Sequence, residues 1–245
     1  MIDQMRRAYA IAKKDVRIYY LKGAVVIFGI LSPAFLFLAF MIGRDLPVDF
    51  LIAGLLGMTI FFASTSVAPV IAPTETQTRN LERLAAAPIS ITTILFGDVL
   101  ASVFFGIVIS LVPIILGMAL GVTVTHPFIL ALGIVLAAFC FSAMGLIFSS
   151  APTSMTSTVM MLSTMIKFPL VFISGIFIPV QELPSWGQAL ASISPLTYIT
   201  DLCRYSFQGA CHYPVMVDIG ALTVFLAVFM AIAIKLHERS LPKRL

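Results

Sequence analysis

The chain contains six apolar stretches, each close to the length that a helix needs to cross a lipid bilayer. Roughly 20 apolar residues span a bilayer core as a helix, and helices satisfy all of their backbone polar groups there. The stretches cover residues 23–43, 50–72, 94–120, 127–149, 155–179 and 214–235. The sequence therefore predicts an all-α, polytopic membrane protein with one transmembrane domain over residues 1–245.

The composition excludes most soluble alternatives. Hydrophobic residues make up 60% of the chain and charged residues only 11%, whereas a soluble domain has about 25% charged residues. The net charge is +4, but the basic residues cluster near the chain ends and form no extended patch. Nucleic-acid binding is therefore a poor explanation for them, and a membrane topology signal is a better one.

The distribution of lysine and arginine predicts the orientation in the membrane. Only Arg44 and Arg204 fall on one side of the six spans. The end segments and the loop after the second span hold Arg6, Arg7, Lys13, Lys14, Arg17, Lys22, Arg79, Arg83, Lys235, Arg239, Lys243 and Arg244. Because cytoplasmic loops are rich in these residues, both termini are expected in the cytoplasm.

Residues 1–22 have the pattern of an amphipathic helix that precedes the first span. The apolar positions recur in steps of three and four, and charged residues occupy the other faces. These positions are Ile2, Met5, Tyr9, Ala12, Val16 and Tyr19. The pattern predicts a helix along the cytoplasmic interface. A helix that packs on a soluble partner fits the same pattern, and the two can coexist in a complex.

Two segments between the spans are expected to be structured. The cytoplasmic segment 73–93 contains NLERLAAAP, whose strong helix formers end at Pro88 and predict a short helix. The extracytoplasmic segment from Ser174 to Tyr213 is too apolar for a free loop, and three prolines divide it. It predicts a re-entrant helical hairpin over residues 180–213, with Ser194-Pro195 as a helix start and Trp186 in the interfacial aromatic belt. A helix pair lying flat on the outer surface remains an alternative.

No arrangement of residues favours catalysis or nucleotide binding by this chain. His237-Glu238 begins like a zinc-protease motif but lacks the second histidine, and no lysine directly follows a glycine, so the G-K-[ST] core of a phosphate loop is absent. The serines and threonines of span five have no histidine or acid in that span to activate them. Any ATP and Mg would belong to another subunit.

Ionisable residues inside apolar segments are the remaining candidates. Lys167 lies well inside the fifth span, where a charge is costly and commonly functional. It either lines a pathway that favours anionic head groups or is a snorkelling or inter-helix bonded lysine. Asp98 is expected to be solvated at the cytoplasmic edge of span three. Asp201 and Arg204 are three residues apart and are expected to form a local pair.

The cysteines give little guidance. Cys140 lies in an apolar run, where a small hydrophobic side chain is the ordinary interpretation. Cys203 and Cys211 could pair if their segment faces an oxidising side, but a continuous helix would hold them too far apart.

Two motifs resemble those of the type-2 ABC exporter permeases, which serve drug, polysaccharide and lipid-linked export. In the cytoplasmic motif Arg79 and Asn80 replace the usual glycine-threonine pair, and Asp98 stands where a lysine is common. The matching positions there are Glu75, Leu81, Glu82, Leu84, Pro88 and Ser90, with Arg83 between them. The matching positions of the outer motif are Ser174, Gly175, Pro179, Leu183, Pro184, Trp186, Pro195, Leu196, Tyr198, Asp201 and Arg204.

The resemblance, which covers nearly the whole chain, implies a mechanism and partners. Two permease copies would form the pathway, two ABC ATPase subunits would bind beneath them, and a coupling helix around residues 80–87 would transmit their closure. The outer hairpin would cap the exit, in the plasma membrane of a bacterium or archaeon. The competing hypotheses are a secondary transporter or channel driven by an ion gradient and, less favoured, a membrane-embedded enzyme.

Overall fold

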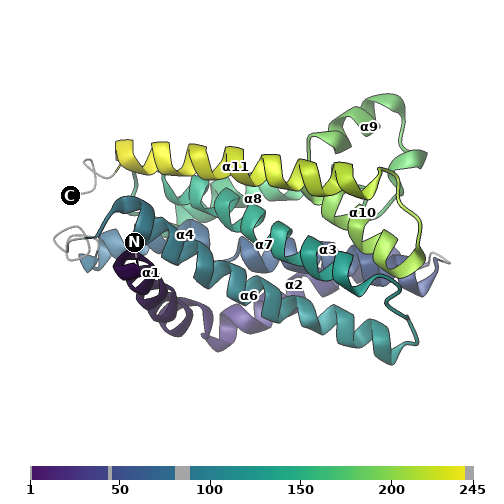
Figure 1. Cartoon of the computed structure of the whole chain (residues 1–245), viewed down its shortest axis with the longest axis horizontal. Coiled ribbons are helices and arrows are strands. Elements are labelled where there is room, and N and C mark those ends of the chain that lie inside the picture. The colour runs from purple at the N-terminus through teal and green to yellow at the C-terminus, as the bar shows by residue number, and fades with distance from the viewer. Residues whose placement is uncertain (1, 44–45, 81–88, 241–245) are drawn as a thin grey trace.

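The computed structural model describes residues 2–43, 46–80 and 89–240, and this part of the chain is helical without a strand. Its long helices lie side by side in one elongated bundle (Figure 1). They are α2 (Gly23–Met41), α3 (Val48–Ser64), α4 (Ala68–Gln77), α6 (Ile91–Ala119), α7 (Pro127–Ser149), α8 (Thr156–Ile173) and α11 (Val215–Ser240). Within the described residues, five segments are long and apolar enough to cross a membrane, and a bent pair adds a sixth.

The bent pair joins the N-terminal helix to the first span. Helix α1 (Ile2–Asp15) continues into a π-helical segment, η1 (Val16–Tyr20), and the chain then turns by 76° into α2. Helix α1 packs on α6 at Gly97, where a Cβ atom would come within 2.7 Å of the Ile11 side chain. A glycine is therefore required for the close approach of these two helices.

The face that α1 buries overlaps only partly with the predicted apolar stripe, since Ala12 of the stripe is buried. Met5 and Tyr9 of the stripe are 64% and 66% exposed, whereas Asp15 is fully buried. The periodicity predicts the helix but not the face that packs on α6, where Ala8 and Ile11 lie against Gly97. The position of α1 at the membrane interface remains a prediction.

The second predicted span is broken into two helices. Helix α3 ends at Ser64, α4 begins at Ala68, and α4 continues to Gln77. Residues 73–77 of the predicted cytoplasmic segment are therefore the end of α4, and the side of the membrane on which they lie remains a prediction. Pro69 accounts for the break, because it lacks the N–H that would bond to the Thr65 carbonyl, and its ring crowds that carbonyl.

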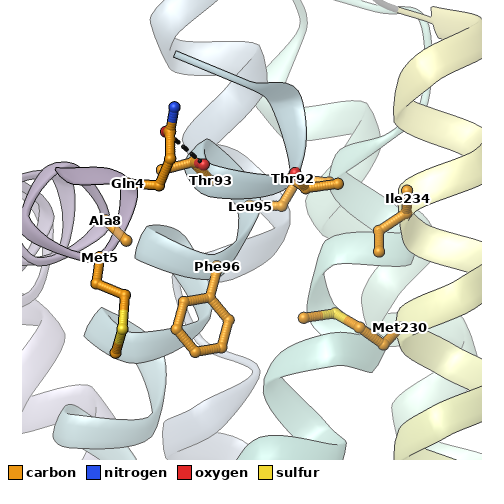
Figure 2. A pocket seen from close by; sticks show the side chains of 9 residues that line it. All are labelled: Gln4, Met5, Ala8, Thr92, Thr93, Leu95, Phe96, Met230 and Ile234. Atoms are coloured by element: carbon orange, nitrogen blue, oxygen red, sulfur yellow. Dashed lines mark hydrogen bonds between the residues drawn. The ribbon is translucent and has the colours of Figure 1, made fainter. Parts of the chain in front are cut away.

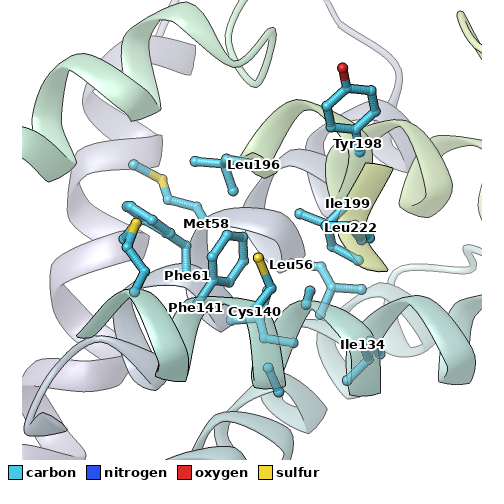
Figure 3. Close-up of a cluster of buried hydrophobic side chains, with 14 of the residues drawn as sticks. Leu56, Met58, Phe61, Ile134, Cys140, Phe141, Leu196, Tyr198, Ile199 and Leu222 are labelled. Atoms are coloured by element: carbon cyan, nitrogen blue, oxygen red, sulfur yellow. The ribbon is translucent and has the colours of Figure 1, made fainter. Parts of the chain in front are cut away.

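The core of the bundle forms where α3, α7 and α10 (Pro195–Gln208) meet. Figure 3 shows its side chains, with Leu56 and Phe61 from α3 facing Phe141 from α7 and Ile199 from α10. The rings of Phe61 and Phe141 meet edge to face, with centroids 4.9 Å apart. This geometry is favourable for aromatic pairs and ties the second span to the fourth.

The two ends of the bundle differ in structure. The start of α1 and the end of α11 lie at one end, here called the terminal end, and α9 (Ser185–Ser192) lies at the other, the hairpin end (Figure 1). The hairpin end also holds the short 3-10 helix η2 (Val180–Glu182) and the start of α11. Because the start of α1 and the end of α11 lie at the same end of the bundle, the arrangement agrees with an even number of membrane spans. That this side is cytoplasmic remains a prediction.

The boundaries of the last two spans shift relative to the sequence prediction. Helix α8 ends at Ile173 instead of residue 179, and α11 continues to Ser240 instead of residue 235. Helix α10 starts at Pro195 with Ser194 at its N-cap position, although the Ser194 side chain makes no capping hydrogen bond. The predicted helix start is thus confirmed, and re-entry of the hairpin into the membrane remains a prediction.

Candidate functional site

The predicted site residues fall into two groups, at opposite ends of the bundle. Glu75 lies on α4 near the terminal end, while Leu81, Glu82, Arg83, Leu84 and Pro88 lie outside the described residues. The outer motif lies at the hairpin end. Lys167 lies on α8 between these groups.

A buried cluster of charged side chains joins α1, α4 and α6 near the terminal end. The Lys14 ammonium is ion-paired with the Glu75 carboxylate and lies 3.0 Å from Oδ1 of Asp15. Asp15, Glu75 and Asp98 are at most 3% exposed. The expectation that Asp98 is solvated is therefore wrong, because packing of α1 on α6 covers it.

This cluster has three carboxyl groups for one lysine. Asp15 of α1 and Asp98 of α6 are buried close enough to influence each other electrostatically. In α1, outside the apolar spans, burial raises the pKa of Asp15. Burial opposes the charge on Lys14, but the nearby Asp15 and Glu75 outweigh it and raise the Lys14 pKa above its usual range. Lys14 therefore stays charged and holds α1 to α4.

Further polar contacts fix the same end of the bundle. The Thr93 hydroxyl donates to Oε1 of Gln4 at 2.9 Å, which ties the start of α6 to α1. Figure 2 shows this bond at the edge of a groove of about 310 Å³, which Met5, Phe96 and Met230 line from α1, α6 and α11. Nε2 of Gln77 donates to the carbonyl of Ser154, which ties the end of α4 to the α7–α8 connection. The segment that precedes residues 81–88 is therefore held by several helices.

Lys167 bonds to the backbone at the break in the second span. Its Nζ donates to the Thr65 carbonyl oxygen at 2.7 Å, and the Ser102 hydroxyl donates to the neighbouring Ser64 carbonyl at 2.6 Å. Pro69 deprives the Thr65 carbonyl of its usual helical donor, and such a group is costly to leave unpaired in a membrane. The inter-helix bonded alternative for Lys167 thus has a specific partner. Lys167 also lines a cavity between α2, α3–α4 and α8.

At the hairpin end, the outer motif brings Gly175 and Arg204 together. The Arg204 side chain donates to the Gly175 carbonyl at 2.6 Å, and its guanidinium lies 4.3 Å from the centre of the Phe50 ring. Gly175 has φ +77°, and a Cβ atom there would lie 2.5 Å from Cγ2 of Val180. The glycine is therefore required both for its backbone conformation and for space.

The expected Asp201–Arg204 pair is wrong. The Asp201 carboxylate instead accepts hydrogen bonds from the backbone N–H groups of His212 and Tyr213, at 2.8 to 2.9 Å. It thereby fixes the connection between α10 and α11, while Arg204 points to Gly175. Burial lowers the pKa of Arg204 to about 10, against the opposing effect of Asp201.

The other residues of the outer motif hold the short helices together. The Tyr198 hydroxyl donates to the Ser192 carbonyl at 2.7 Å, which connects α10 to the end of α9. Pro184 occupies the N-cap position of α9 and Pro179 that of η2. Trp186 is 69% exposed on α9, and its place in an aromatic belt stays a prediction. Cys140, Cys203 and Cys211 are free thiols.

Three parts of these sites could not be assigned from the sequence pattern: Lys14, Asp15 and the Thr65 carbonyl. The Thr65 carbonyl could have been found from the sequence, because Pro69, four residues later, cannot donate the helical hydrogen bond that this carbonyl would otherwise accept. The charges of α1 gave no such signal, because every basic residue there fits a topology explanation equally well. Among the described residues, no three His, Cys, Asp or Glu side chains converge as metal ligands.

Comparison with known proteins identifies the family. Residues 5–207 match the family model described as ABC-2 type transporter. The chain is 27% identical over 194 residues to the inner membrane transport permease YadH of Escherichia coli K12, which covers 78% of this chain and 75% of YadH. It is 24% identical over 169 residues to the daunorubicin resistance ABC transporter permease protein DrrB1 of Streptomyces coeruleorubidus, covering 64% and 57% of the two chains. This chain therefore belongs to the ABC-2 type transporter family and is a multi-pass membrane transport permease, the membrane subunit of an ABC transporter.

Proposed function

We propose that this permease exports its substrate with energy from ATP that a separate ABC ATPase subunit hydrolyses. Two copies of the chain would form the pathway, and ATP and Mg would bind to the partner ATPase. Support comes from the family match over residues 5–207 and from the missing phosphate-loop core in the sequence. The name of the relative DrrB1 refers to drug resistance, which supports outward transport.

The coupling path begins at the segment that follows α4. The predicted coupling helix around residues 80–87 would be the segment that the ATPase grips, with Glu82 and Leu84 as contacts. Glu75, six residues before Leu81, is ion-paired with Lys14 of α1. A displacement of the gripped segment would thus move both α4 and α1, and α1 packs on α6. The Lys14–Glu75 pair is the single observation that most supports this path.

The outer motif would close the exit of the pathway. The bonds from Arg204 to Gly175 and from Tyr198 to Ser192 join the segment before η2 and the end of α9 to α10 as one unit, which α10 anchors in the core of the bundle. Such a unit can cover an exit as a rigid body. Membrane lipids would surround the exposed apolar faces of α8 and α11.

Co-purification tests the proposal directly. The tagged chain, extracted from its native host in mild detergent, is expected to bring down an ATPase with a phosphate loop in a near one-to-one ratio. Vesicles with the complex should transport only when ATP is supplied. Transport by the purified permease alone, driven by a proton or sodium gradient, would replace the proposal with the secondary-transporter hypothesis.

A helix-breaking substitution tests the coupling segment. Leu84→Pro is expected to abolish ATP-driven export while insertion into the membrane is retained, because proline costs a helix interior about 3 kcal/mol. The measurement is export in vesicles alongside ATP hydrolysis by the complex. A matched control is Leu120→Pro, at the end of α6 on the hairpin end, which should leave ATPase binding unchanged. Normal export by Leu84→Pro would contradict the assigned coupling role.

A further inference from the structure

An open-sided cavity of about 590 Å³ lies between α2, the broken span α3–α4 and α8. Each helix contributes one face to it. On α8 the lining residues Met160, Thr164, Lys167 and Phe168 have helical spacing. On α2 the lining positions run from Ala24 to Ser32, about 12 Å along the helix axis. The cavity therefore extends from the level of η1 into the membrane-spanning part.

The walls are mainly apolar and partly aromatic. Phe62 and Phe168 meet edge to face in the wall, with ring centroids 6.3 Å apart. Phe28 of α2 also lines the cavity and is 73% exposed, so it forms part of the open side. A volume of this size, lined mostly by hydrophobic and aromatic groups, is typical of a site for one drug-sized molecule.

The charges that line the cavity have one sign. Lys22 and Lys167 are both lining residues, and no Asp or Glu among the described residues lines it. Lys22 is exposed at the N-cap of α2, and its Nζ lies 6.0 Å from the centre of the Tyr19 ring. Lys167 is 6% exposed and lies deeper, on α8. The two cations therefore mark the shallow and the deep part of one cavity.

The Lys167 ammonium has capacity for a second partner. It carries three N–H donors, and within the described part of the chain its recorded hydrogen bond goes to the Thr65 carbonyl alone. A bond to a neutral carbonyl leaves the positive charge uncompensated, which is costly at this depth. An anionic group in the cavity would supply both an acceptor and the opposite charge.

We propose that this cavity binds a single amphipathic anion, with its apolar body against Phe62 and Phe168 and its carboxylate, sulfonate or phosphate group held by Lys167 or Lys22. The assignment rests on the proposed export function, since it names the class of cargo that the pathway takes up. The anion can come from transported cargo or from a membrane phospholipid, and the volume favours the smaller molecule.

Photo-crosslinking tests the assignment without the ATPase, so its outcome is separable from that of the export proposal. The full chain in phosphatidylcholine nanodiscs is exposed to a diazirine-bearing medium-chain fatty acid or to the matching uncharged alcohol. Mass spectrometry then locates the crosslinks. The acid is expected to label the lining faces of α2, α4 and α8 about tenfold more than the alcohol, the effect of one charge-assisted hydrogen bond.

Substitutions separate charge from structural support. Lys167→Gln removes the charge but keeps an N–H donor, and it should remove most of the preference for the acid. Lys22→Gln should remove a smaller part of that preference. Lys167→Arg should retain the preference, and Lys235→Gln on the exposed face of α11 is the matched control. A symmetrical size-exclusion peak verifies folding of each variant.

Three results would overturn the assignment. These are equal labelling by the acid and the alcohol, an unchanged preference in folded Lys167→Gln, and labelling confined to the outer faces of the bundle. The addition of phosphatidylglycerol to the nanodiscs distinguishes the two sources. Unchanged labelling supports a cargo site, whereas strong competition assigns the cavity to a resident lipid and rejects the cargo assignment.

Discussion

Gly175→Ala is expected to destabilise the protein by about 2 to 5 kcal/mol, the sum of left-handed backbone strain and overpacking. The strain arises because φ is +77°, and the overpacking because the added Cβ would lie 2.5 Å from Val180. The substitution would also displace the carbonyl to which Arg204 donates. The measurement is the midpoint temperature at which the purified, detergent-solubilised protein loses its monodisperse peak.

Gly209→Ala is the matched control for this prediction. Gly209 ends α10 with φ +70°, but a Cβ atom there would meet nothing within 4 Å. The substitution should therefore lower the free energy of unfolding only by the backbone strain, about 1 to 2 kcal/mol. Equal midpoint shifts for the two variants would show that the contact with Val180 contributes nothing and that the compact hairpin end is not held at Gly175.

Glu75→Lys is expected to abolish export, because it places two cations side by side in a buried site. Removal of one member of a buried ion pair alone costs about 3 to 5 kcal/mol. The double variant Lys14→Glu with Glu75→Lys restores opposite charges and should recover part of the activity. The measurements are ATP-dependent transport in vesicles and ATP hydrolysis by the purified complex.

Lys13→Glu is the control for the charge of α1, because Lys13 is exposed one residue before the pair. It should leave transport near the level of the unmodified protein, as is usual for exposed charges. The exchanged pair should show a coupling energy above about 0.5 kcal/mol in a double-mutant cycle. Additive effects of the two single substitutions would mean that Lys14 and Glu75 do not act together.

The all-helical architecture could be predicted because apolar length is a strong local signal. Each predicted span contains a long helix in the structure, and the helix start at Pro195 was found from Ser194-Pro195 alone. The break in the second span was not predicted, although Pro69 marks it. Hydropathy averaged over about 20 residues does not register the one backbone N–H that proline lacks. The predicted ends of α8 and α11 differ from the observed ends because the same average does not locate single residues.

The contacts of the charged residues could not be predicted from spacing along the chain. Asp201 and Arg204 have the separation of a helical ion pair, yet each binds backbone groups that are distant in the sequence. Asp98 seemed solvated because the sequence does not show that α1 folds back over α6. Tertiary packing determines these partners, and local periodicity does not contain that information.

The break between α3 and α4 has a mechanical consequence for the second span. The carbonyls of Ser64 and Thr65 bond to the side chains of Ser102 and Lys167 instead of to the next helical turn. These two carbonyls are therefore satisfied by side chains of α6 and α8, so that the backbone hydrogen bonds of α3 and α4 do not run continuously across the break. A hinge at this break would let α4, which carries Glu75, change its angle while α3 stays packed on α10.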